Sequence, residues 1–269
     1  MKDKVRLAMV VGILATLLVA PGLFPAPAGA PAPAEPASLP EPGPAEAPPA
    51  ACCPHEHEAP AGPVKTAYLT FDDGPSEVTL DILDILGDFG VPATFFVCGN
   101  HWDFGRNAYR RMLDEGHAIG NHSYTHNLTR IYASAAAFWA DFDRLQHLLE
   151  EATGDRPPIM RFPGGSNNRF ARRELMDELL AGLEERGIRY FDWNVCSGDS
   201  AVLGQDPEVI IRRVLDGVRG LDEAVILFHD SYSRATTVTA LPVILEALLA
   251  DGFAFRTLGP DSTGVQFPR

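Results

Sequence analysis

The chain has 269 residues, of which 46% are hydrophobic and 22% charged, a composition typical of a folded domain with appendages. Its formal net charge of −14 provides no basic surface for a phosphate backbone, so nucleic acid is not an expected partner. Four cysteines are too few for a disulfide-stapled mini-domain, and no pair has the Cys-x-x-Cys spacing of a zinc ribbon.

The N-terminal segment has the pattern of an export signal. Three basic residues within Met1–Arg6 precede an apolar run of 14 residues, Leu7–Ala20, which Pro21 ends. Because a permanent membrane span needs about 20 apolar residues, residues 1–24 are expected to be either a cleaved signal peptide or a retained signal anchor. Both alternatives predict export to the cell surface or beyond, with membrane contact only through this segment.

The following segment, residues 25–63, is rich in Pro, Ala and Glu, and 14 of the 23 prolines fall before residue 64. Few of its side chains are large enough to bury, so it cannot offset its ordering entropy and is predicted to be a disordered linker. Two cysteines and two histidines within Cys52–His57 could ligate a soft metal, but such a cluster in a linker is more often incidental. Residues 64–269 are then the folded domain.

From residue 64 onward, short β-like runs alternate with amphipathic helical windows, the pattern that builds a parallel sheet or barrel. Apolar residues repeat at helical spacing in the windows 78–89, 138–149 and 241–248, and a glycine ends each window. The expected fold class is α/β, with seven strands at 65–71, 93–97, 117–120, 159–161, 190–193, 225–228 and 253–257.

Residues capable of chemistry fall just after the ends of these strands. In parallel α/β folds the carboxyl ends of the strands share one face, where ligands bind and catalysis takes place. Residues far apart in the sequence are therefore expected to converge there: Asp72, Asp73, His122, His126, Arg161, Asp199 and His229.

His122 and His126 are four residues apart, a spacing that places both on one side of a helical turn and lets them bind one metal ion. Asp73 would complete a set of two nitrogens and one oxygen, leaving a position open for water, as in catalytic zinc sites. The adjacent Asp72 points in another direction and can address that water. Each signal is weak alone, since Asp-Asp-Gly-Pro is also a turn sequence.

Five motifs occur in order and carry a family resemblance: Thr70–Pro75, His122–His126, Arg161–Gly165, Asp192–Asp199 and Leu227–His229. Together they resemble the polysaccharide deacetylases of carbohydrate esterase family 4, which share the NodB homology domain. The likeness covers about Val64 to Thr257 and is greatest to bacterial peptidoglycan N-acetylglucosamine deacetylases. The fold that it implies is a distorted, incomplete (β/α) barrel of about seven parallel strands.

The resemblance also implies a role for each matching residue. Asp73, His122 and His126 would hold one divalent metal ion, zinc in the first place, with cobalt or nickel as alternatives. Asp72 would be the general base that activates water, and Arg161 would keep it ionised.

His229 would be the general acid that protonates the departing amine, and Asp199 would hold its imidazole and raise its pKa. A backbone N–H near Gly164 would meet the acetyl oxyanion, and Leu227 would lie against the methyl group. Simpler alternatives exist, because Arg161 and Asp199 could form a structural ion pair and Leu227 is also a plausible core residue.

Two positions depart from the common family pattern. Gly164 stands where a tyrosine usually follows the proline, and Ser200 stands where many members have a tryptophan, so Trp193 or Trp102 is expected to supply the missing wall. Cys98 and Cys196 both fall near the expected site; an oxidised pair is conceivable, but two free thiols are favoured.

The sequence thus predicts a metal-dependent hydrolase that removes N-acetyl groups from a polymeric amino sugar, with N-acetylglucosamine of peptidoglycan as the favoured substrate and acetate as a product. The expected partner is a cell-wall glycan or another N-acetylated polysaccharide. One alternative is an O-acetyl esterase or a deacetylase of a chitin-like polymer, xylan or exopolysaccharide. Another is a non-catalytic wall-binding module, which the presence of all the expected ligands and of both acid-base residues disfavours.

Overall fold

The computed structural model describes residues 65–268, so the expected leader and linker, residues 1–24 and 25–63, lie outside the described residues. This part of the chain contains eight strands: β1 (Lys65–Asp72), β2 (Thr94–Val97), β3 (Ala118–Asn121), β4 (Ile159–Met160), β5 (Arg189–Tyr190), β6 (Val195–Cys196), β7 (Glu223–His229) and β8 (Phe253–Phe255). Its seven helices are α1 (Glu77–Phe89), α2 (Asp103–Asp114), α3 (Leu128–Ile131), α4 (Ala135–Thr153), α5 (Arg173–Glu185), α6 (Pro207–Gly217) and α7 (Ala235–Ala250). Over this range none of the helices combines the length and the apolar character that crossing a bilayer requires.

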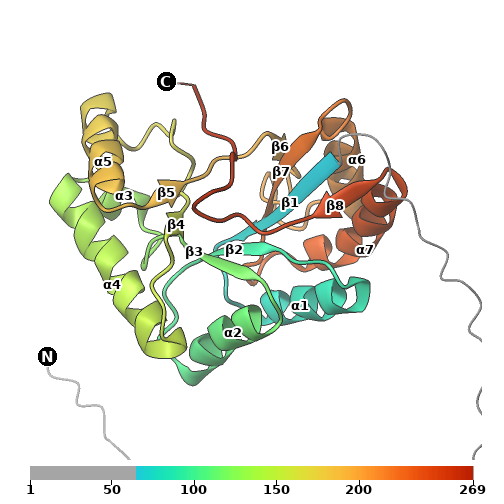
Figure 1. The fold of residues 1–269 in the computed structure, drawn as a ribbon, viewed down its shortest axis with the longest axis horizontal. Coiled ribbons are helices and arrows are strands. Elements are labelled where there is room, and N and C mark those ends of the chain that lie inside the picture. Colours follow the sequence, from blue (N-terminus) through green and yellow to red (C-terminus); the bar gives the residue numbers. More distant parts are fainter. Residues whose placement is uncertain (1–64, 269) are drawn as a thin grey trace, which may run out of the picture. The chain divides into compact units, whose positions relative to one another are not determined.

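The strands form one curled sheet, and the helices lie around its outside (Figure 1). The strand order is β5-β4-β3-β2-β1-β7-β6, with β8 beside the first half of β1, and every pairing is parallel. Since β5 and β6 end this order without pairing to each other, the barrel is incomplete. The predicted fold class is therefore confirmed.

The seven expected strands are all present, with small shifts at their ends, and β6 is an eighth that the sequence did not predict. β6 has only two residues, pairing Val195 with Ile226 and Cys196 with Leu227 of β7, which is too short for an alternating pattern. The run expected over 190–193 ends early, because the Asp192 N–H donates to the C-terminal segment at Val265 O instead of a strand.

The turn between β1 and α1 is fixed by local capping. The Ser76 hydroxyl accepts from the Val78 N–H, and the Ser76 N–H donates to the Thr79 hydroxyl. Two backbone N–H groups at the start of α1 thus have side-chain acceptors. Gly90, in the left-handed conformation at φ 64°, ends the helix. The apolar stripe of α1 is buried as predicted, with Ile82 and Leu86 fully inaccessible.

Side-chain alternation along β1 separates two cores. Leu69 and Phe71 face outward and belong to the large cluster between the sheet and the helices, whereas Tyr68 faces inward with Phe96 and Phe191 inside the barrel. Asp72 lies four residues after Tyr68 on β1, so both side chains point to the same face of the sheet. Its carboxylate is therefore directed toward the barrel interior at the carboxyl end of the sheet.

The C-terminal segment covers the open side of the barrel, where it contacts the chain after β5. Asp192 donates its N–H to Val265 O, and its Oδ2 accepts from the Phe267 N–H at 2.8 Å. A Cβ at Gly264 would lie 2.3 Å from the ring of Phe191, so only glycine allows this close approach. The segment takes the place that further strand pairing would fill in a closed barrel.

Candidate active site

The carboxyl ends of neighbouring strands bring the predicted polar residues to one edge of the sheet. Asp72 ends β1 and His229 ends β7, and the two are directly paired across these strands. His122 and Arg161 follow the adjacent strands β3 and β4, where the Arg161 N–H donates to Asn121 O. Asp199 follows β6 and contacts His229.

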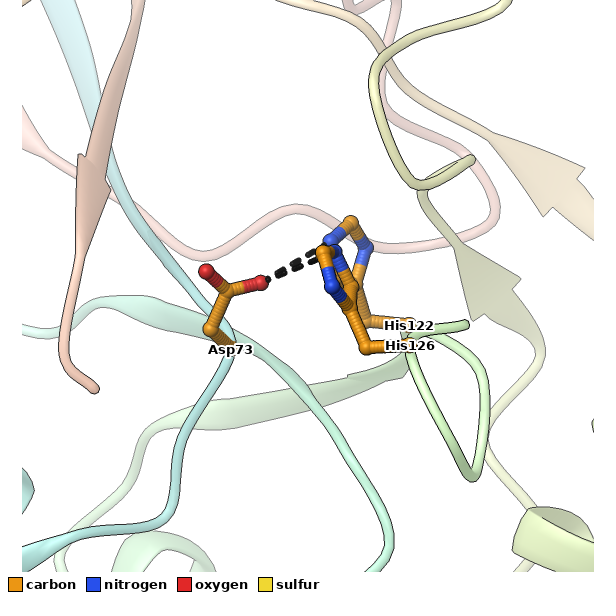
Figure 2. A group of neighbouring side chains, drawn as sticks. All are labelled: Asp73, His122 and His126. Atoms are coloured by element: carbon orange, nitrogen blue, oxygen red, sulfur yellow. Dashed lines mark ion pairs between the residues drawn. The ribbon is translucent and has the colours of Figure 1, made fainter. Parts of the chain in front are cut away.

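Asp73, His122 and His126 form a three-sided group whose ligand atoms lie within 4.8 Å of one another (Figure 2). Asp73 Oδ1 is 3.2 Å from His126 Nε2 and 3.5 Å from His122 Nε2. Two tetrahedral ligands at about 2.1 Å from a zinc ion are separated by about 3.4 Å, so these spacings fit one ion. Among residues 65–268 this is the only group of three His, Cys, Asp or Glu side chains placed in this way.

Two further observations fit a cation at this point. Asp73 Oδ1 is buried and has no hydrogen-bond partner, which leaves a buried acceptor unsatisfied by the protein. His122 Nδ1 lies 2.9 Å from Arg161 O and donates its proton there, so Nε2 is the ring nitrogen that faces Asp73 and can bind a cation. Burial acts to raise the pKa of Asp73, but the facing imidazoles, His122 above all, lower that pKa well below its ordinary value.

The segment from His122 to His126 is a loop, and the prediction of a helical turn there is wrong. Ser123 and His126 have positive φ values of 80° and 49°, which a right-handed helix does not contain. The two imidazole rings nevertheless lie 5.3 Å apart, because the loop curls back on itself. The conformation of this loop, and not helical periodicity, therefore brings the two imidazoles close together.

In this loop, side-chain oxygens accept the hydrogen bonds that backbone carbonyls would accept in a helix. Asp141 of α4 is the main acceptor. Its Oδ1 accepts from the Ser123 hydroxyl and the Tyr124 N–H, both at 2.6 Å, and its Oδ2 accepts from the Thr125 hydroxyl at 2.7 Å. The His126 N–H in turn donates to the Ser123 hydroxyl. This role could not be predicted from the sequence, since one aspartate on the polar side of an amphipathic helix resembles any other.

Asp72 is buried and paired with a fully buried arginine. Arg161 Nη1 donates to Asp72 Oδ1 at 2.9 Å, and the remaining guanidinium donors bind Thr70 Oγ1 and the carbonyls of Phe191 and Asp192. The second carboxylate oxygen, Oδ2, lies 3.7 Å from His122 Nε2. Asp72 is thus an oriented carboxylate with one oxygen held and the other beside the ligand group.

His229 is held by the buried carboxylate of Asp199. The Asp199 Oδ1 lies 2.8 Å from His229 Nδ1, while Oδ2 accepts from the His229 N–H and the Thr237 hydroxyl. Burial acts to lower the pKa of His229, but the hydrogen bond and charge of Asp199 outweigh it and raise the pKa to about 9. The imidazole therefore carries a proton at neutral pH.

Asp230 is a buried acid that the sequence reasoning missed. It accepts from the Gly74 N–H at 2.8 Å and from the Thr79 hydroxyl at 2.6 Å. A Cβ at Gly74 would lie 2.1 Å from the Asp230 carboxylate, so glycine is required there. Burial raises the pKa of Asp230 to about 7. This contact ties the residue after Asp73 to the residue after His229.

The residues expected to contact substrate lie on β7 and on the segments that follow β4 and β5. Leu227 is buried on the same side of β7 as the inner-core residue Val225. The Gly164 N–H makes no hydrogen bond within residues 65–268, and Gly164 has φ 81°. Trp193 packs its ring against Phe267 at 4.9 Å and lies 5.5 Å from the Arg161 guanidinium.

The remaining expectations concern Trp102 and the two cysteines. Trp102 is 69% exposed and contacts His101, whereas Trp193 lies beside Arg161, so Trp193 is the better placed of the two to form a wall of the site. Cys98 and Cys196 are both free, as favoured. Cys98 follows β2 and Cys196 ends β6, and strands β1 and β7 lie between these two strands in the sheet.

Comparison of the chain with known proteins identifies relatives within a single enzyme family. The model of the polysaccharide deacetylase family matches residues 59–179. The chain is 33% identical to a putative polysaccharide deacetylase of Bacillus subtilis, over 72% of this chain and 67% of that protein. It is also 33% identical to a chitooligosaccharide deacetylase of a Bradyrhizobium species, over 72% of this chain and 89% of that protein.

A solved structure shares the fold over most of its length. The catalytic domain of a peptidoglycan N-acetylglucosamine deacetylase from Eubacterium rectale superposes with a TM-score of 0.72 and 34% sequence identity. The match covers 76% of this chain and 93% of that domain.

Proposed function

The chain belongs to the polysaccharide deacetylases of carbohydrate esterase family 4, and we propose that it removes the N-acetyl group of N-acetylglucosamine units in peptidoglycan. It is a hydrolase of carbohydrate N-acetyl groups, and acetate and a free amine are the products. The observation that carries the proposal is the placement of the Asp73, His122 and His126 group directly beside Asp72 and the strand partner of Asp72, His229.

The donor set fits one divalent cation, and zinc is the proposed metal. Two imidazole nitrogens and one carboxylate oxygen, with a fourth position left open, are the ligands of a catalytic zinc site. Cobalt or nickel would suit the same nitrogen and oxygen donors. When bound, the ion would polarise the acetyl carbonyl and lower the pKa of a water molecule toward about 7.

Asp72 would act as the general base. Its Oδ1 is occupied by Arg161, so Oδ2 is the oxygen that takes the proton from the attacking water. Arg161 fixes the orientation of this carboxylate, since the guanidinium is itself held by hydrogen bonds to Thr70 Oγ1 and to the carbonyls of Phe191 and Asp192.

His229 would act as the general acid that protonates the departing nitrogen. Its pKa of about 9 keeps it charged near neutral pH, and Asp199 holds Nδ1, which leaves Nε2 to donate. Gly164 would offer its N–H to the developing oxyanion and Leu227 would contact the acetyl methyl group. Trp193 would form part of the wall around the sugar.

The charged state of His229 favours an amide over an ester as the natural substrate. An amine leaves an amide readily only after protonation, whereas an alcohol leaves an ester with much less assistance. A strong hydrogen bond that keeps His229 protonated is therefore of more use for N-deacetylation than for O-deacetylation.

The full-length protein tests the proposal directly. Purified enzyme should release acetate from N-acetylated peptidoglycan, lose this activity with a chelator and regain it with zinc. Asp72→Asn should lower kcat by about 10²–10⁴-fold, because the general base is removed, while the protein still binds one equivalent of metal. Undiminished activity after chelation, or an active Asp72→Asn enzyme, would contradict the proposal.

We also propose that the protein is exported, on the support of the basic and apolar pattern of residues 1–24 and of a substrate that lies outside the membrane. Fractionation of cells should recover the protein from the envelope or the medium. Recovery from the cytoplasm alone would contradict export.

A further inference from the structure

The loop that carries both histidine ligands also places an aromatic side chain on the surface beside them. Tyr124 is two residues from His122 and from His126, so at most about 7 Å of backbone separates it from either. Its ring lies against Gly99, where a Cβ would approach the ring to 2.5 Å, and the Tyr124 carbonyl accepts from the Gly99 N–H. The loops after β2 and β3 are therefore joined at Tyr124, at the same edge of the sheet as the site.

A row of side chains extends outward from Tyr124. Arg144 of α4 stacks on its ring with the guanidinium carbon 3.6 Å from the centroid, and His101 Nδ1 is 3.3 Å from its hydroxyl. The His101 ring in turn packs against Trp102 in a tilted arrangement, with 4.4 Å between the ring centroids. We call these four residues, with His147, the Tyr124 patch. The patch runs from the ligand loop to a widely exposed indole.

The patch borders a cavity of about 380 Å³ between the start of α2 and the middle of α4. Arg106, Arg144, His101 and His147 line it, with Glu151 as its single acidic residue. Glu151 is already paired with Arg106 at 2.9 Å. The lining thus has one arginine charge more than acidic charge, in a chain whose formal net charge is −14.

Arg144 is the charge in this cavity without an anionic partner. No carboxylate of residues 65–268 lies within ion-pair distance of it, and its contact is the face of Tyr124. The nearby acids of α4 are committed elsewhere: Asp141 binds the ligand loop and Asp143 pairs with Arg186. A guanidinium whose contact is the face of an aromatic ring keeps N–H donors available for a carboxylate.

We propose that the Tyr124 patch binds the carboxylate-bearing part of the glycan, so that the enzyme prefers an acidic N-acetylated polymer to a neutral one. Trp102 would pack against the apolar face of a sugar ring, and Arg144 would bind the acid group of the neighbouring sugar. Muramic acid supplies such a carboxylate next to N-acetylglucosamine in peptidoglycan strands whose stem peptides have been removed, since the stem peptide otherwise holds this carboxyl in an amide bond. A chitin-like polymer has no such group. The inference rests on the proposed function and specifies its substrate.

The test compares two forms of one polymer. Peptidoglycan strands freed of their stem peptides carry the muramic acid carboxylates, and amidation with methylamine removes the charge while the sugar backbone stays the same. For the full-length zinc enzyme, kcat/KM for acetate release is measured on both forms. The ratio of the acidic to the amidated value is the readout, and the wild-type ratio should exceed one.

Arg144→Gln should lower this ratio about tenfold, because the charged donor for the carboxylate is lost. Arg144→Lys, which keeps the charge, should retain most of the preference. Arg186→Gln is the matched control: this arginine also lies on a ring, that of Trp139 at 3.9 Å, but outside the patch. The control should leave the ratio unchanged.

A wild-type ratio near one, or a ratio that Arg144→Gln leaves at the wild-type value, would overturn the subsite. The same holds if Arg186→Gln lowers the ratio as much as Arg144→Gln does, since the effect would then reflect net charge. If the wild-type enzyme releases acetate from neither form, the proposed function fails instead, and the two failures are distinguished.

Discussion

At the scale of single residues, the site depends on pairs in which one member sets the state of the other. Arg161 orients Asp72, and Asp199 holds His229 and raises its pKa to about 9 against the opposing effect of burial. The same pairs are buried, so removing one partner leaves the other without its counter-charge. The proposed base is thereby held in a fixed orientation, and the proposed acid is kept protonated near neutral pH.

Asp199→Asn should therefore move the alkaline limb of the pH profile. In the wild type the protonated His229 is the active form, so kcat should fall as the pH rises through about 9. Without the Asp199 charge, burial would lower the pKa toward or below the ordinary 6.5, and activity should be lost at a correspondingly lower pH. A kcat profile from pH 5 to 10 measures this.

Asp206→Asn, a change at the exposed start of α6, serves as the control and should leave the limb in place. If Asp199→Asn leaves the alkaline limb at the wild-type pH, the kcat profile does not report the ionisation of His229, and the assignment of His229 as the general acid is contradicted.

The sequence predicted this part of the site well, because its residues stand directly after strands that the apolar pattern identified. It could not predict Asp141, Asp230 or Thr237, which reach the site from helices or hold the turns around it. Such partners are set by tertiary packing, and nothing in their own sequence neighbourhoods distinguishes them from solvated polar residues.

At the scale of elements, α4 supports the loop of the proposed metal ligands from outside the barrel. The helix was predicted from its apolar stripe, but the conformation of the loop that it supports was predicted wrongly as a helical turn. The spacing of His122 and His126 suits a helix equally well, and only the acceptors of Asp141 decide against it. Local spacing alone does not determine a loop that a distant side chain organises.

Asp141→Asn should weaken metal binding by about 10–100-fold, since the amide cannot accept all the hydrogen bonds that order the loop. The measurement is zinc affinity by competition with a chromophoric chelator, which does not depend on turnover. Asp143→Asn, two residues away and paired only on the surface with Arg186, is the control and should bind zinc as the wild type does. Equal affinities in all three proteins would contradict a supporting role for Asp141.

At the scale of the whole described domain, the C-terminal segment closes a barrel that its strands leave open. Asp192 connects three parts of the chain, because it accepts from Ser166 and Phe267 and donates to Val265 O. Ser166 directly follows the Gly164 and Gly165 turn. This arrangement could not be predicted from the sequence, since the segment after β8 lacks the period of a strand or a helix.

Truncation after Pro260 should lower the free energy of unfolding by at least about 2 kcal/mol, because the buried contacts of Val265 and Phe267 are lost and Phe191 becomes exposed. Urea unfolding followed by fluorescence measures the change. A midpoint equal to that of the full-length protein would show that the segment does not stabilise the barrel.

The central claim is that one cation is bound by Asp73, His122 and His126, and X-ray absorption at the zinc edge tests it most directly. Full-length protein loaded with one equivalent of zinc should show only nitrogen and oxygen neighbours at about 2.0–2.2 Å, with the outer-shell scattering of two imidazoles. Loss of one imidazole in His126→Ala would identify the ligand. A sulfur neighbour at about 2.3 Å, or a spectrum without imidazole scattering, would contradict the account.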